Sequence, residues 1–389
     1  MSTLSRIRLA GQHLIRDLLA RPSTNPRDLR RHQSAAVDWL CRAQDATDDG
    51  GVAASFHLLH GWLPSYPETT GYIACTFFDL ARQPPHAHLA ARAWRMIEWL
   101  LGCQYPDGGF PGHFGDLAHP PIVFNTGQIL LGLVRAAESD PAHRDLHRSI
   151  ARAAAWLTAV QDDDGCWRRC THAGVVHTYN TRTAFALLRA GRLLDDDRFL
   201  AAGMRNLRWA LAQQRDDGWF EHAGFWPDVP PYLHTIAYTI DGLMEAGLLL
   251  KADELCEAAR AAAEPLAREL VLTDKLAGAY DRGWRAAGHY RCLTGEAQMA
   301  IVWARLSART GRALFREAAE RVVRRLAATQ HLAGPPEVRG AIAGSCPIWG
   351  EYARLEFPNW AAKFFVDAVA ALEAIGGAGL KPTEAPECV

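Results

Sequence analysis

The stretches QYPDGGF (104–110), QDDDGCW (161–167) and QRDDGWF (214–220) decide the fold, because they are copies of one pattern. Each has a glutamine, then one to three acidic residues and a glycine, and ends in an aromatic residue. Asp and Gly favour the turn and left-handed conformations that end a helix, and the aromatic ring can pack back over the helix end. A looser copy, QDATDDGGV (44–52), precedes them. The four stretches therefore indicate helix stops in an internal repeat.

A tryptophan five residues before the glutamine extends the pattern backwards into a helix. The pairs are Trp39/Gln44, Trp99/Gln104, Trp156/Gln161 and Trp209/Gln214. A degenerate copy ends at Gln330, and the 116 residues from Gln214 to Gln330 are about twice the spacing of the other copies. One copy, expected near Leu272, has therefore lost its glutamine. We predict that the glutamines tie each helix end to the backbone of the next hairpin.

A second helix follows each turn and is apolar on nearly every face, which is typical of a helix buried inside a protein. Asn and Thr, which are preferred N-caps, stand at most of the expected starts. These starts are Thr69, Asn125, Asn180, His234, Thr294 and Asn359. The Trp-x4-Gln helices are instead amphipathic, with arginine-rich outer faces.

An inner ring of apolar helices inside an outer ring of amphipathic helices satisfies both patterns. The sequence therefore predicts an all-α fold, an (α/α)6 toroid of six helical hairpins, whose inner helices all run in one direction and whose closure leaves no terminal repeat uncovered. We expect an N-terminal amphipathic helix in residues 1–30, a single toroid domain over 31–375 and a C-terminal tail over 376–389.

Composition excludes several classes of protein. The chain has 389 residues, of which 49% are hydrophobic, and its formal net charge is −1, which provides no field for nucleic acid or anionic lipid. No run of apolar residues approaches the length of a membrane span, and the N-terminus lacks the features of a signal peptide. Nine scattered cysteines suit reduced thiols. We therefore expect a cytoplasmic protein; the oligomeric state is not predicted.

The turn pattern, Gln-x3-Gly-x-Trp or -Phe, resembles the QW repeat of squalene and oxidosqualene cyclases. YLHTIAYTIDGL (232–243) is similar to an inner-helix start of protein prenyltransferase β subunits. This resemblance implies the toroid fold and does not by itself imply the chemistry. The central Asp-x-Asp-Asp acid of the cyclases is missing. The prenyltransferase zinc site is matched only by His234, with Cys292 as the nearest substitute for the missing Asp-x-Cys, so we expect no metal or other cofactor and keep zinc as an alternative.

A closer similarity is to bacterial toroid proteins associated with exopolysaccharide genes. The segments that carry it are WLPSYPETTGYI (62–73), HTIAYTIDGL (234–243), CLTGEAQMA (292–300) and SCPIWGEYARLEFPNWAAKFFVDA (345–368). The resemblance implies a carbohydrate-related role.

We expect the working end of the molecule where the six inner helices begin, because their unsatisfied N–H groups and partial positive charges converge there. Such a mouth suits an anionic ligand such as a sugar acid. Aromatic rings stack on sugar rings, and amides, guanidinium groups and carboxylates bind hydroxyls. The predicted substrate-binding residues are Tyr66, Asn125, Tyr179, Asn180, Arg182, Glu296, Trp360 and Lys363. For Asn125 and Asn180, simple N-capping is an equally good explanation.

The predicted catalytic residues are Glu68, His234, Tyr238, Asp241 and Asp281. Glu68 paired with Asp281 or Asp241 would support hydrolysis. His234 and Tyr238, one helical turn apart, would instead support elimination or epimerisation. The alternatives are a helix-dipole role for Glu68, packing roles for His234 and Tyr238, and a buried ion pair between Asp241 and Arg182 or another arginine.

Three functions remain open at this point. The first is a carbohydrate-active enzyme, whether hydrolase, lyase or epimerase, acting on an acidic surface polysaccharide or its precursor. The second is a terpenoid cyclase or prenyltransferase-like enzyme. The third is a non-catalytic glycan-binding protein of a polysaccharide biosynthesis complex.

Overall fold

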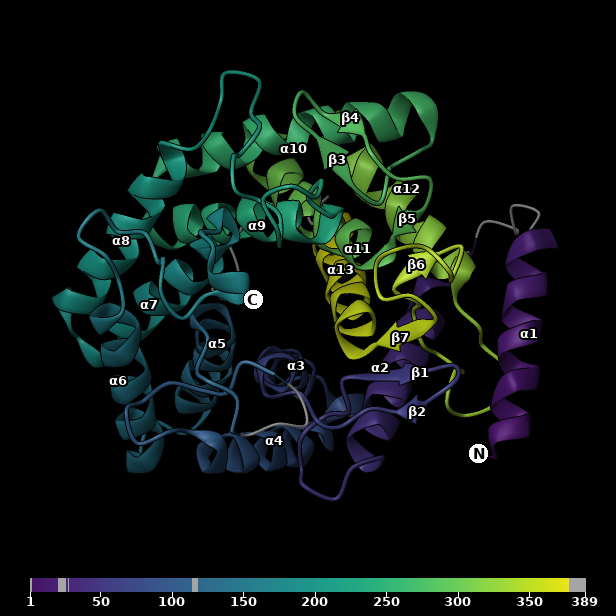
Figure 1. Ribbon diagram of the computed structural model, residues 1–389, viewed down its shortest axis with the longest axis horizontal. Coiled ribbons are helices and arrows are strands. Elements are labelled where there is room, and N and C mark those ends of the chain that lie inside the picture. Colours follow the sequence, from purple (N-terminus) through teal and green to yellow (C-terminus); the bar gives the residue numbers. More distant parts are fainter. Residues whose placement is uncertain (1, 20–25, 27, 114–117, 378–389) are drawn as a thin grey trace.

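The computed structural model describes the whole chain except residues 1, 20–25, 27, 114–117 and 378–389. Six inner helices surround a common centre and six outer helices surround them, so the predicted (α/α)6 toroid is confirmed (Figure 1). The inner helices are α3 (Pro67–Leu80), α5 (Val123–Ser139), α7 (Thr181–Leu194), α9 (Leu233–Leu250), α11 (Leu293–Thr310) and α13 (Asn359–Gly377). The outer helices are α2 (Leu29–Asp45), α4 (Leu89–Cys103), α6 (Arg144–Ala159), α8 (Asp197–Leu211), α10 (Asp253–Thr273) and α12 (Ala313–Thr329).

The inner helices are parallel to one another. In the first turns of α13 and α3, the side-chain amide of Asn359 donates to Thr69 Oγ1 at 2.9 Å. In the last turns of α5 and α3, Arg135 donates to Asp79 at 2.7 Å. The N-terminal ends of neighbouring inner helices therefore lie together, as do their C-terminal ends. The six N-termini share one face of the ring, here called the mouth.

The inner helices begin without the side-chain caps that the sequence suggested. Asn125 lies inside α5, whose N-cap is Ile122, and Asn180 is the N-cap of α7 but makes no capping hydrogen bond. The N-cap interpretation is therefore wrong for Asn125, whereas Asn180 holds the N-cap position without the capping hydrogen bond. Asn125 is instead turned toward the neighbouring helix, where its amide donates to the hydroxyl of Tyr66.

The turn glutamines join consecutive outer helices, as predicted. Gln161 Nε2 donates to Gly165 O in its own turn and to Ala202 O in α8, both at 3.0 Å. The same pair of bonds is made by Gln44, Gln104, Gln214 and Gln330. Because the second acceptor of Gln330 is His32 O in α2, the last outer helix is joined to the first.

Glycine is needed in these turns for conformation and for close approach. Gly165 has φ +88°, and a Cβ there would lie 2.5 Å from the backbone of Arg205 in the next outer helix. The joint that lost its glutamine is held differently. Arg321 and Arg325 of α12 donate to the carbonyls of Val271 and Asp274 at the end of α10.

Short strands line the loops on the mouth side. They are β1 (Ser55–His57), β2 (Gly61–Trp62), β3 (Tyr280–Asp281), β4 (Arg285–Ala286), β5 (Arg291–Cys292), β6 (Ser345–Cys346) and β7 (Glu356–Pro358). The antiparallel order β2-β1-β7 links the loop before α3 to the loop before α13, so the ring is also closed at its mouth. Short 3-10 helices are η1 (Pro84–His86), η2 (His172–Gly174) and η3 (Thr178–Asn180).

The N-terminal helix α1 (Thr3–Leu19) lies against the outside of the ring (Figure 1). It falls within the predicted segment 1–30, whereas the predicted tail 376–389 lies almost wholly outside the described residues. Among the helices of the described chain, none has the length and apolarity that crossing a membrane requires. The cysteines that the structure describes are free thiols.

Candidate functional site

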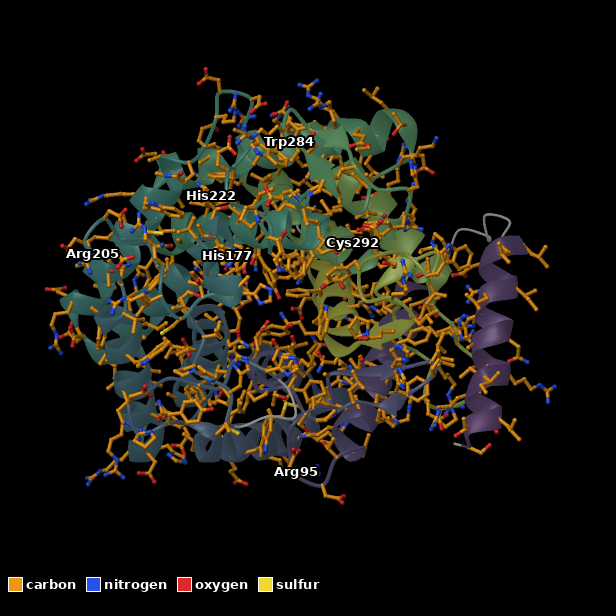
Figure 2. All side chains as sticks on the ribbon, viewed as in Figure 1. Arg95, His177, Arg205, His222, Trp284 and Cys292 are labelled. Atoms are coloured by element: carbon orange, nitrogen blue, oxygen red, sulfur yellow. The ribbon has the colours of Figure 1, made fainter. Side chains whose placement is uncertain are left out.

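Side chains from the inner helices and the mouth loops meet at the centre of the ring (Figure 2). Most of them are aromatic and buried, and Glu68 is their one carboxyl group. We call this group the ring-centre cluster: Tyr66, Glu68, Tyr72, Phe124, Tyr179, His234, Tyr238, Tyr352, Trp360 and Phe364.

Glu68 lies in the first turn of α3 and is 8% exposed. The hydroxyl of Tyr66 donates to its Oε2 at 2.7 Å, and the same hydroxyl accepts from Asn125 Nδ2 at 3.1 Å. Burial raises the pKa of Glu68 to about 7, against the opposing effect of the Tyr66 hydrogen bond. Glu68 can therefore both donate and accept a proton near neutral pH.

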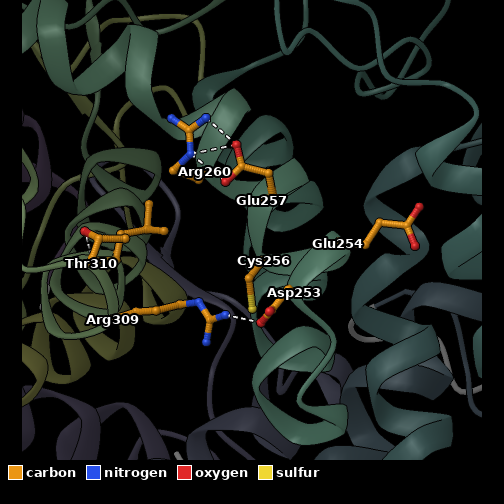
Figure 3. Close-up of a pocket in the computed structure, with 8 residues that line it drawn as sticks. Asp253, Glu254, Cys256, Glu257, Arg260, Arg309 and Thr310 are labelled. Carbon is orange, nitrogen blue, oxygen red and sulfur yellow. Dashed lines mark hydrogen bonds and ion pairs between the residues drawn. The ribbon is translucent and has the colours of Figure 1, made fainter.

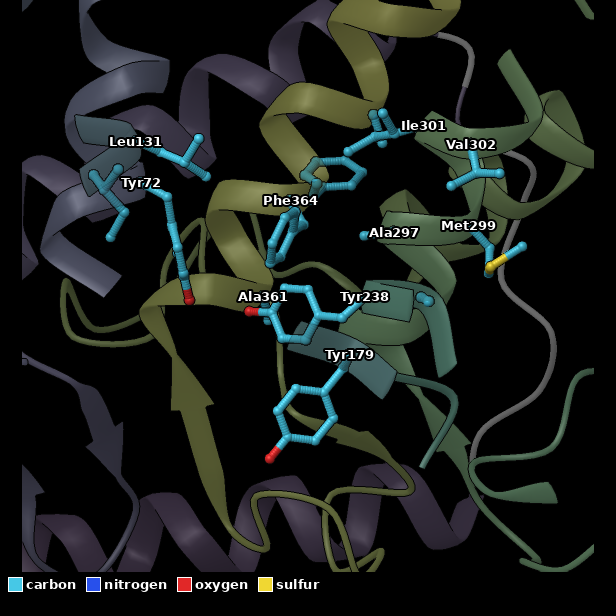
Figure 4. Packing of buried hydrophobic residues seen from close by; sticks show 14 of the residues in the cluster. Tyr72, Leu131, Tyr179, Tyr238, Ala297, Met299, Ile301, Val302, Ala361 and Phe364 are labelled. Atoms are coloured by element: carbon cyan, nitrogen blue, oxygen red, sulfur yellow. The ribbon is translucent and has the colours of Figure 1, made fainter. Parts of the chain in front are cut away.

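Tyrosine hydroxyls surround this carboxyl group. Burial raises the pKa values of Tyr72, Tyr179 and Tyr238, and the charge of Glu68 raises each of them further. The ring of Tyr238 lies beside that of Phe364, at a centroid distance of 5.9 Å (Figure 4). It also contacts Phe124, at a centroid distance of 4.9 Å. The tyrosines therefore stay neutral, as hydrogen-bonding groups with apolar rings.

His234 stands in the first turn of α9, at a centroid distance of 4.4 Å from Tyr238 and 5.1 Å from Tyr352. Its Nδ1 lies 2.8 Å from Gln298 Oε1. Burial lowers the pKa of His234 to about 3, although the Gln298 contact opposes this shift. The imidazole is therefore neutral, and with Nδ1 donating to Gln298, Nε2 is left as a hydrogen-bond acceptor.

Several buried polar atoms at the start of these helices have no hydrogen-bond partner among the described residues. They include Oδ1 of Asn180 and Nε2 of Gln298. Buried polar atoms normally find partners, so unpaired ones in a ring of inner-helix N-termini suit a polar ligand. Donors and acceptors are both represented, as sugar hydroxyls require.

Below the cluster, toward the C-terminal ends of the inner helices, lies a layer of ion pairs. Arg182 pairs with Asp241, which also lies 3.3 Å from Arg305 Nη1. Lys363 Nζ lies 2.6 Å from Asp367 Oδ2. Asp241 therefore forms the buried ion pair that was the alternative to a catalytic role. Arg182 is paired with Asp241 and Lys363 with Asp367.

Other predicted site residues lie apart from Glu68. Glu296 is fully buried and accepts from Arg291 Nε at 2.7 Å. Asp281 is exposed in the β3–β4 hairpin, where it pairs with Arg285 at 3.0 Å. The structure therefore does not bring Asp281 to Glu68 as a second carboxylate, and Asp241 lies two turns further along α9 than His234.

The zinc alternative rests on His234 and Cys292. The Cys292 thiol is fully buried, its pKa is raised to about 12 by burial, and it faces the backbone N–H groups of Gly295 and His234. Within the described ranges, no group of three or more His, Cys, Asp or Glu side chains is gathered as a metal site. The absence of a cofactor stays a prediction.

Sequence reasoning missed Tyr72, Phe124, Phe364 and Gln298 as members or neighbours of the site. Each lies on an inner helix, but among so many apolar residues nothing distinguishes a ring facing the centre from one facing the outer helices. Gln298 could have been found, since it stands one turn after Thr294 and directly before the apolar run 299–303.

Two surface hollows lie elsewhere. One, of about 420 Å³, is lined by α10 and α11 at the end of the ring opposite the mouth, where Arg309 pairs with Asp253 and Arg260 with Glu257 (Figure 3). The other, of about 460 Å³, lies beside the turn that follows α2 and includes Asp48 and Trp99. Neither includes a member of the ring-centre cluster.

Comparison with known proteins identifies the architecture. No protein-family model matches the chain. Sporulenol synthase of Bacillus subtilis (strain 168) is 27% identical over 181 residues, which cover 42% of this chain and 26% of that protein's length.

Solved structures match over nearly their whole length. An unsaturated glucuronyl hydrolase specific for heparin is 18% identical, with a TM-score of 0.71 over 91% of this chain and 99% of that chain. Cellobiose 2-epimerase from Bacillus thermoamylovorans B4167 is 11% identical, with a TM-score of 0.70 over 90% and 98%. A D-mannose isomerase is 10% identical, with a TM-score of 0.68 over 91% and 100%. At these identities the likeness establishes the shared α/α toroid fold.

Proposed function

We propose that this protein is a carbohydrate-active enzyme of the hydrolase or epimerase type, acting on a sugar unit of an acidic surface polysaccharide or its precursor. The observation that carries the proposal is Glu68: a single carboxyl group with a pKa near 7, set among tyrosines and beside unpaired polar atoms. The structural similarity to a glucuronyl hydrolase, a cellobiose epimerase and a mannose isomerase supports it.

The acid strength of Glu68 favours this chemistry. A carboxyl group whose pKa lies near the working pH is suited to general acid catalysis at a glycosidic or carbonyl oxygen. Protonation of an alkene, the first step of a cyclase, needs a much stronger acid. Glu68 would therefore serve a sugar substrate better than an isoprenoid one.

The surrounding groups suit a sugar. Rings such as Tyr179 and Trp360 offer apolar faces, while Asn180 and Gln298 offer an unpaired acceptor and an unpaired donor. A sugar carboxylate would meet the N-terminal ends of the inner helices, whose amides and partial positive charge favour an anion.

The second proton-transferring group is His234. Its imidazole is neutral at physiological pH, so Nε2 could accept a proton from a sugar carbon on one face. Glu68 or Tyr238 would donate a different proton to the same carbon on the other face, which inverts that carbon, as epimerisation requires. Hydrolysis with two carboxylates is less well supported, because Asp281 pairs with Arg285 on the rim and Asp241 lies between two arginines.

The test uses purified protein with uronate-containing and neutral oligosaccharides. New reducing ends would indicate hydrolysis, ultraviolet absorbance of an unsaturated product would indicate elimination, and deuterium uptake from heavy water would indicate epimerisation. We expect Glu68→Gln to abolish the activity. Asp281→Asn is the matched control and should retain it, since Asp281 is exposed and outside the cluster. Equal activity of wild type and Glu68→Gln would refute the proposal.

A terpenoid cyclase is the second candidate, favoured by the partial match to sporulenol synthase and by the aromatic character of the cluster. Conversion of a linear polyprene into cyclic products, without any glycan activity, would replace the first proposal. Saturable glycan binding without any product would instead indicate a non-catalytic glycan-binding protein.

A further inference from the structure

The N-terminal helix α1 carries an apolar stripe on its outward face. Leu4 is 81% exposed, Ile7 56%, Ile15 58% and Leu18 72%, and Gly11 stands between them. At 100° per residue these five positions fall within one narrow arc of the helix. Over the described part of the chain, half of the large exposed apolar side chains belong to α1.

The opposite face of α1 holds the helix on the ring. Leu9, Ala10 and His13 are buried there, and His13 packs against Phe357 at a centroid distance of 5.3 Å. Asp17 Oδ2 accepts from the backbone N–H of Ile348 at 2.7 Å near one end of the helix. Near the other end, Arg6 Nε donates to Leu59 O at 3.0 Å. The helix is therefore anchored at both ends, and the stripe remains on the surface.

The stripe reads the same in both directions. Its residues are Leu4, Ile7, Gly11, Ile15 and Leu18, and the intervals between them are three, four, four and three residues. An antiparallel copy of the helix, related by a twofold axis at Gly11, would place Leu4 opposite Leu18 and Ile7 opposite Ile15. Such a surface is self-complementary, which is what an isologous dimer interface requires.

We propose that a second copy of this chain covers the stripe, in a dimer whose two α1 helices cross antiparallel at Gly11. Nothing within the protomer requires glycine there, because a Cβ on Gly11 would meet no atom within 4 Å. Glycine in a helix interior destabilises it relative to alanine, so another use for it is expected. At the twofold axis it allows the two backbones to approach closely.

Charge does not oppose this pairing. Arg8 is the basic residue beside the stripe, and its counterpart would lie about 9 Å away along the helix axes, six residues at 1.5 Å each. Arg6 and Arg16 bind carbonyl groups of the ring at Leu59 and Thr329. A lipid surface fits less well, because helices that lie on membranes present a strongly basic polar face to the headgroups, and here the face opposite the stripe is docked on protein.

The interface should be weak. Leu4 and Leu18 lie about 21 Å apart along the helix, so the helix pair alone covers less than the roughly 800 Å² per partner of a standard interface. We therefore expect dimerisation that depends on concentration.

The test is sedimentation of the full chain and four variants over a wide range of concentration. The wild-type mass should rise from 42.9 kDa toward twice that value. Ile7→Glu should remove the rise, because each carboxylate would face Ile15 of the other helix. Leu272→Glu, at an equally exposed leucine (82%) on α10, is the matched control and should leave it unchanged.

Two double variants test the antiparallel register. Ile7→Lys with Ile15→Glu should restore dimerisation, since each lysine would face a glutamate across the axis. Ile7→Lys with Ile15→Lys should not. Circular dichroism should be unchanged in every variant, because the substituted side chains are exposed in the protomer. A wild-type mass that stays at 42.9 kDa, or an opposite-charge variant that fails to associate, would overturn the proposal. Flotation of a monomeric wild-type chain with anionic phospholipid vesicles, lost in Ile7→Glu, would overturn it in favour of a membrane surface.

Discussion

The protonation state of Glu68 makes the stability of the fold depend on pH. Its pKa in the folded chain is about 7, against an ordinary value of 4.5. Between these values the unfolded chain loses the proton while the folded chain keeps it, so this group's contribution to stability is full below pH 4.5 and falls as the pH rises to 7. Glu68 therefore opposes folding at alkaline pH.

We predict that Glu68→Gln raises the free energy of unfolding by about 3 kcal/mol at alkaline pH and changes it little at acidic pH, because the amide has no charge to bury. Urea unfolding of both proteins across this range measures the difference. Glu296→Gln is the contrasting variant: it leaves Arg291 without its buried partner and should destabilise the protein at both ends of the range. A pH-independent effect of Glu68→Gln would mean that Glu68 keeps an ordinary pKa.

A substitution at Asn180 can show whether this residue binds a ligand or stabilises the start of α7. Because its side chain makes no capping bond, Asn180→Ala should cost well under 1 kcal/mol of stability but weaken substrate binding. Asp196→Ala is the control, since Asp196 caps α8 by accepting from the N–H of Arg198 and its loss should cost about 1 kcal/mol. Thermal unfolding and binding measured on the same samples separate the two roles.

For individual residues, the sequence predicted which side chains gather at the mouth better than it predicted what each of them does. Glu68, Tyr66, His234 and Tyr238 were expected at inner-helix starts, and they do lie together. Asp281 was expected there because its loop leads to an inner helix, but a hairpin turns its side chain to the rim. The position of a residue along the chain shows whether it lies near the mouth. Whether its side chain faces the centre depends on how the helix is rotated about its own axis, and hydrophobic periodicity does not reveal this rotation when the helix is apolar on every face.

Among the elements, the turn glutamines offer a test with an internal control. Gln214 Nε2 donates to Ala258 O in the next outer helix at 2.8 Å, whereas its neighbour Gln213 donates to Trp209 O in its own helix. We predict that Gln214→Ala costs about 1–3 kcal/mol, because it leaves the buried carbonyl of Gly218 without its donor and removes the hydrogen bond to α10, and that Gln213→Ala costs much less. Equal losses in denaturant unfolding would contradict the joint's role.

The mouth loop around Trp226 offers a second test at this scale. Trp226 is 45% exposed, and its ring begins a series of contacts that runs through Phe225 to Tyr179 in the cluster. If the proposed function holds, Trp226→Ala should raise KM for long oligosaccharides roughly tenfold by loss of ring stacking and leave kcat unchanged. Leu248→Ala, an exposed residue at the far end of α9, should change neither constant. A fall in kcat alone would argue against a binding platform.

Element positions followed closely from the repeat. The expected inner starts at Asn125, His234 and Thr294 lie within two residues of the observed helices α5, α9 and α11. The glycine turns predicted where helices stop, and the apolar runs predicted which helices are inner. The capping prediction failed at Asn125 and Asn359 because their amides donate to Tyr66 and Thr69 at the start of α3, contacts that no local pattern reveals.

For the whole molecule, buried histidines predict sensitivity to acid. Burial lowers the pKa of His177 to about 4 and of His234 and His331 to about 3, so the unfolded chain binds protons that the folded chain excludes. Each of them lowers the free energy of unfolding by about 1.4 kcal/mol per pH unit below the ordinary pKa of 6.5, which outweighs the opposite effect of Glu68. Urea unfolding from neutral pH to pH 5 measures the slope, and a flat profile would contradict neutral buried histidines.

The hydrogen bond from Gln330 to His32 joins the last outer helix to the first, as the other turn glutamines join consecutive outer helices. The ring is therefore closed between α13 and α2, although no peptide connects these two helices. Arg30 at the start of α2 even lies 2.7 Å from Glu373 near the end of α13. A short peptide bridging these two points, with a cut placed in one of the aspartate-glycine turns, would therefore yield a circular permutant with the same architecture. The fold would then not depend on which hairpin is synthesised first, because all six hairpins occupy equivalent places in the closed ring.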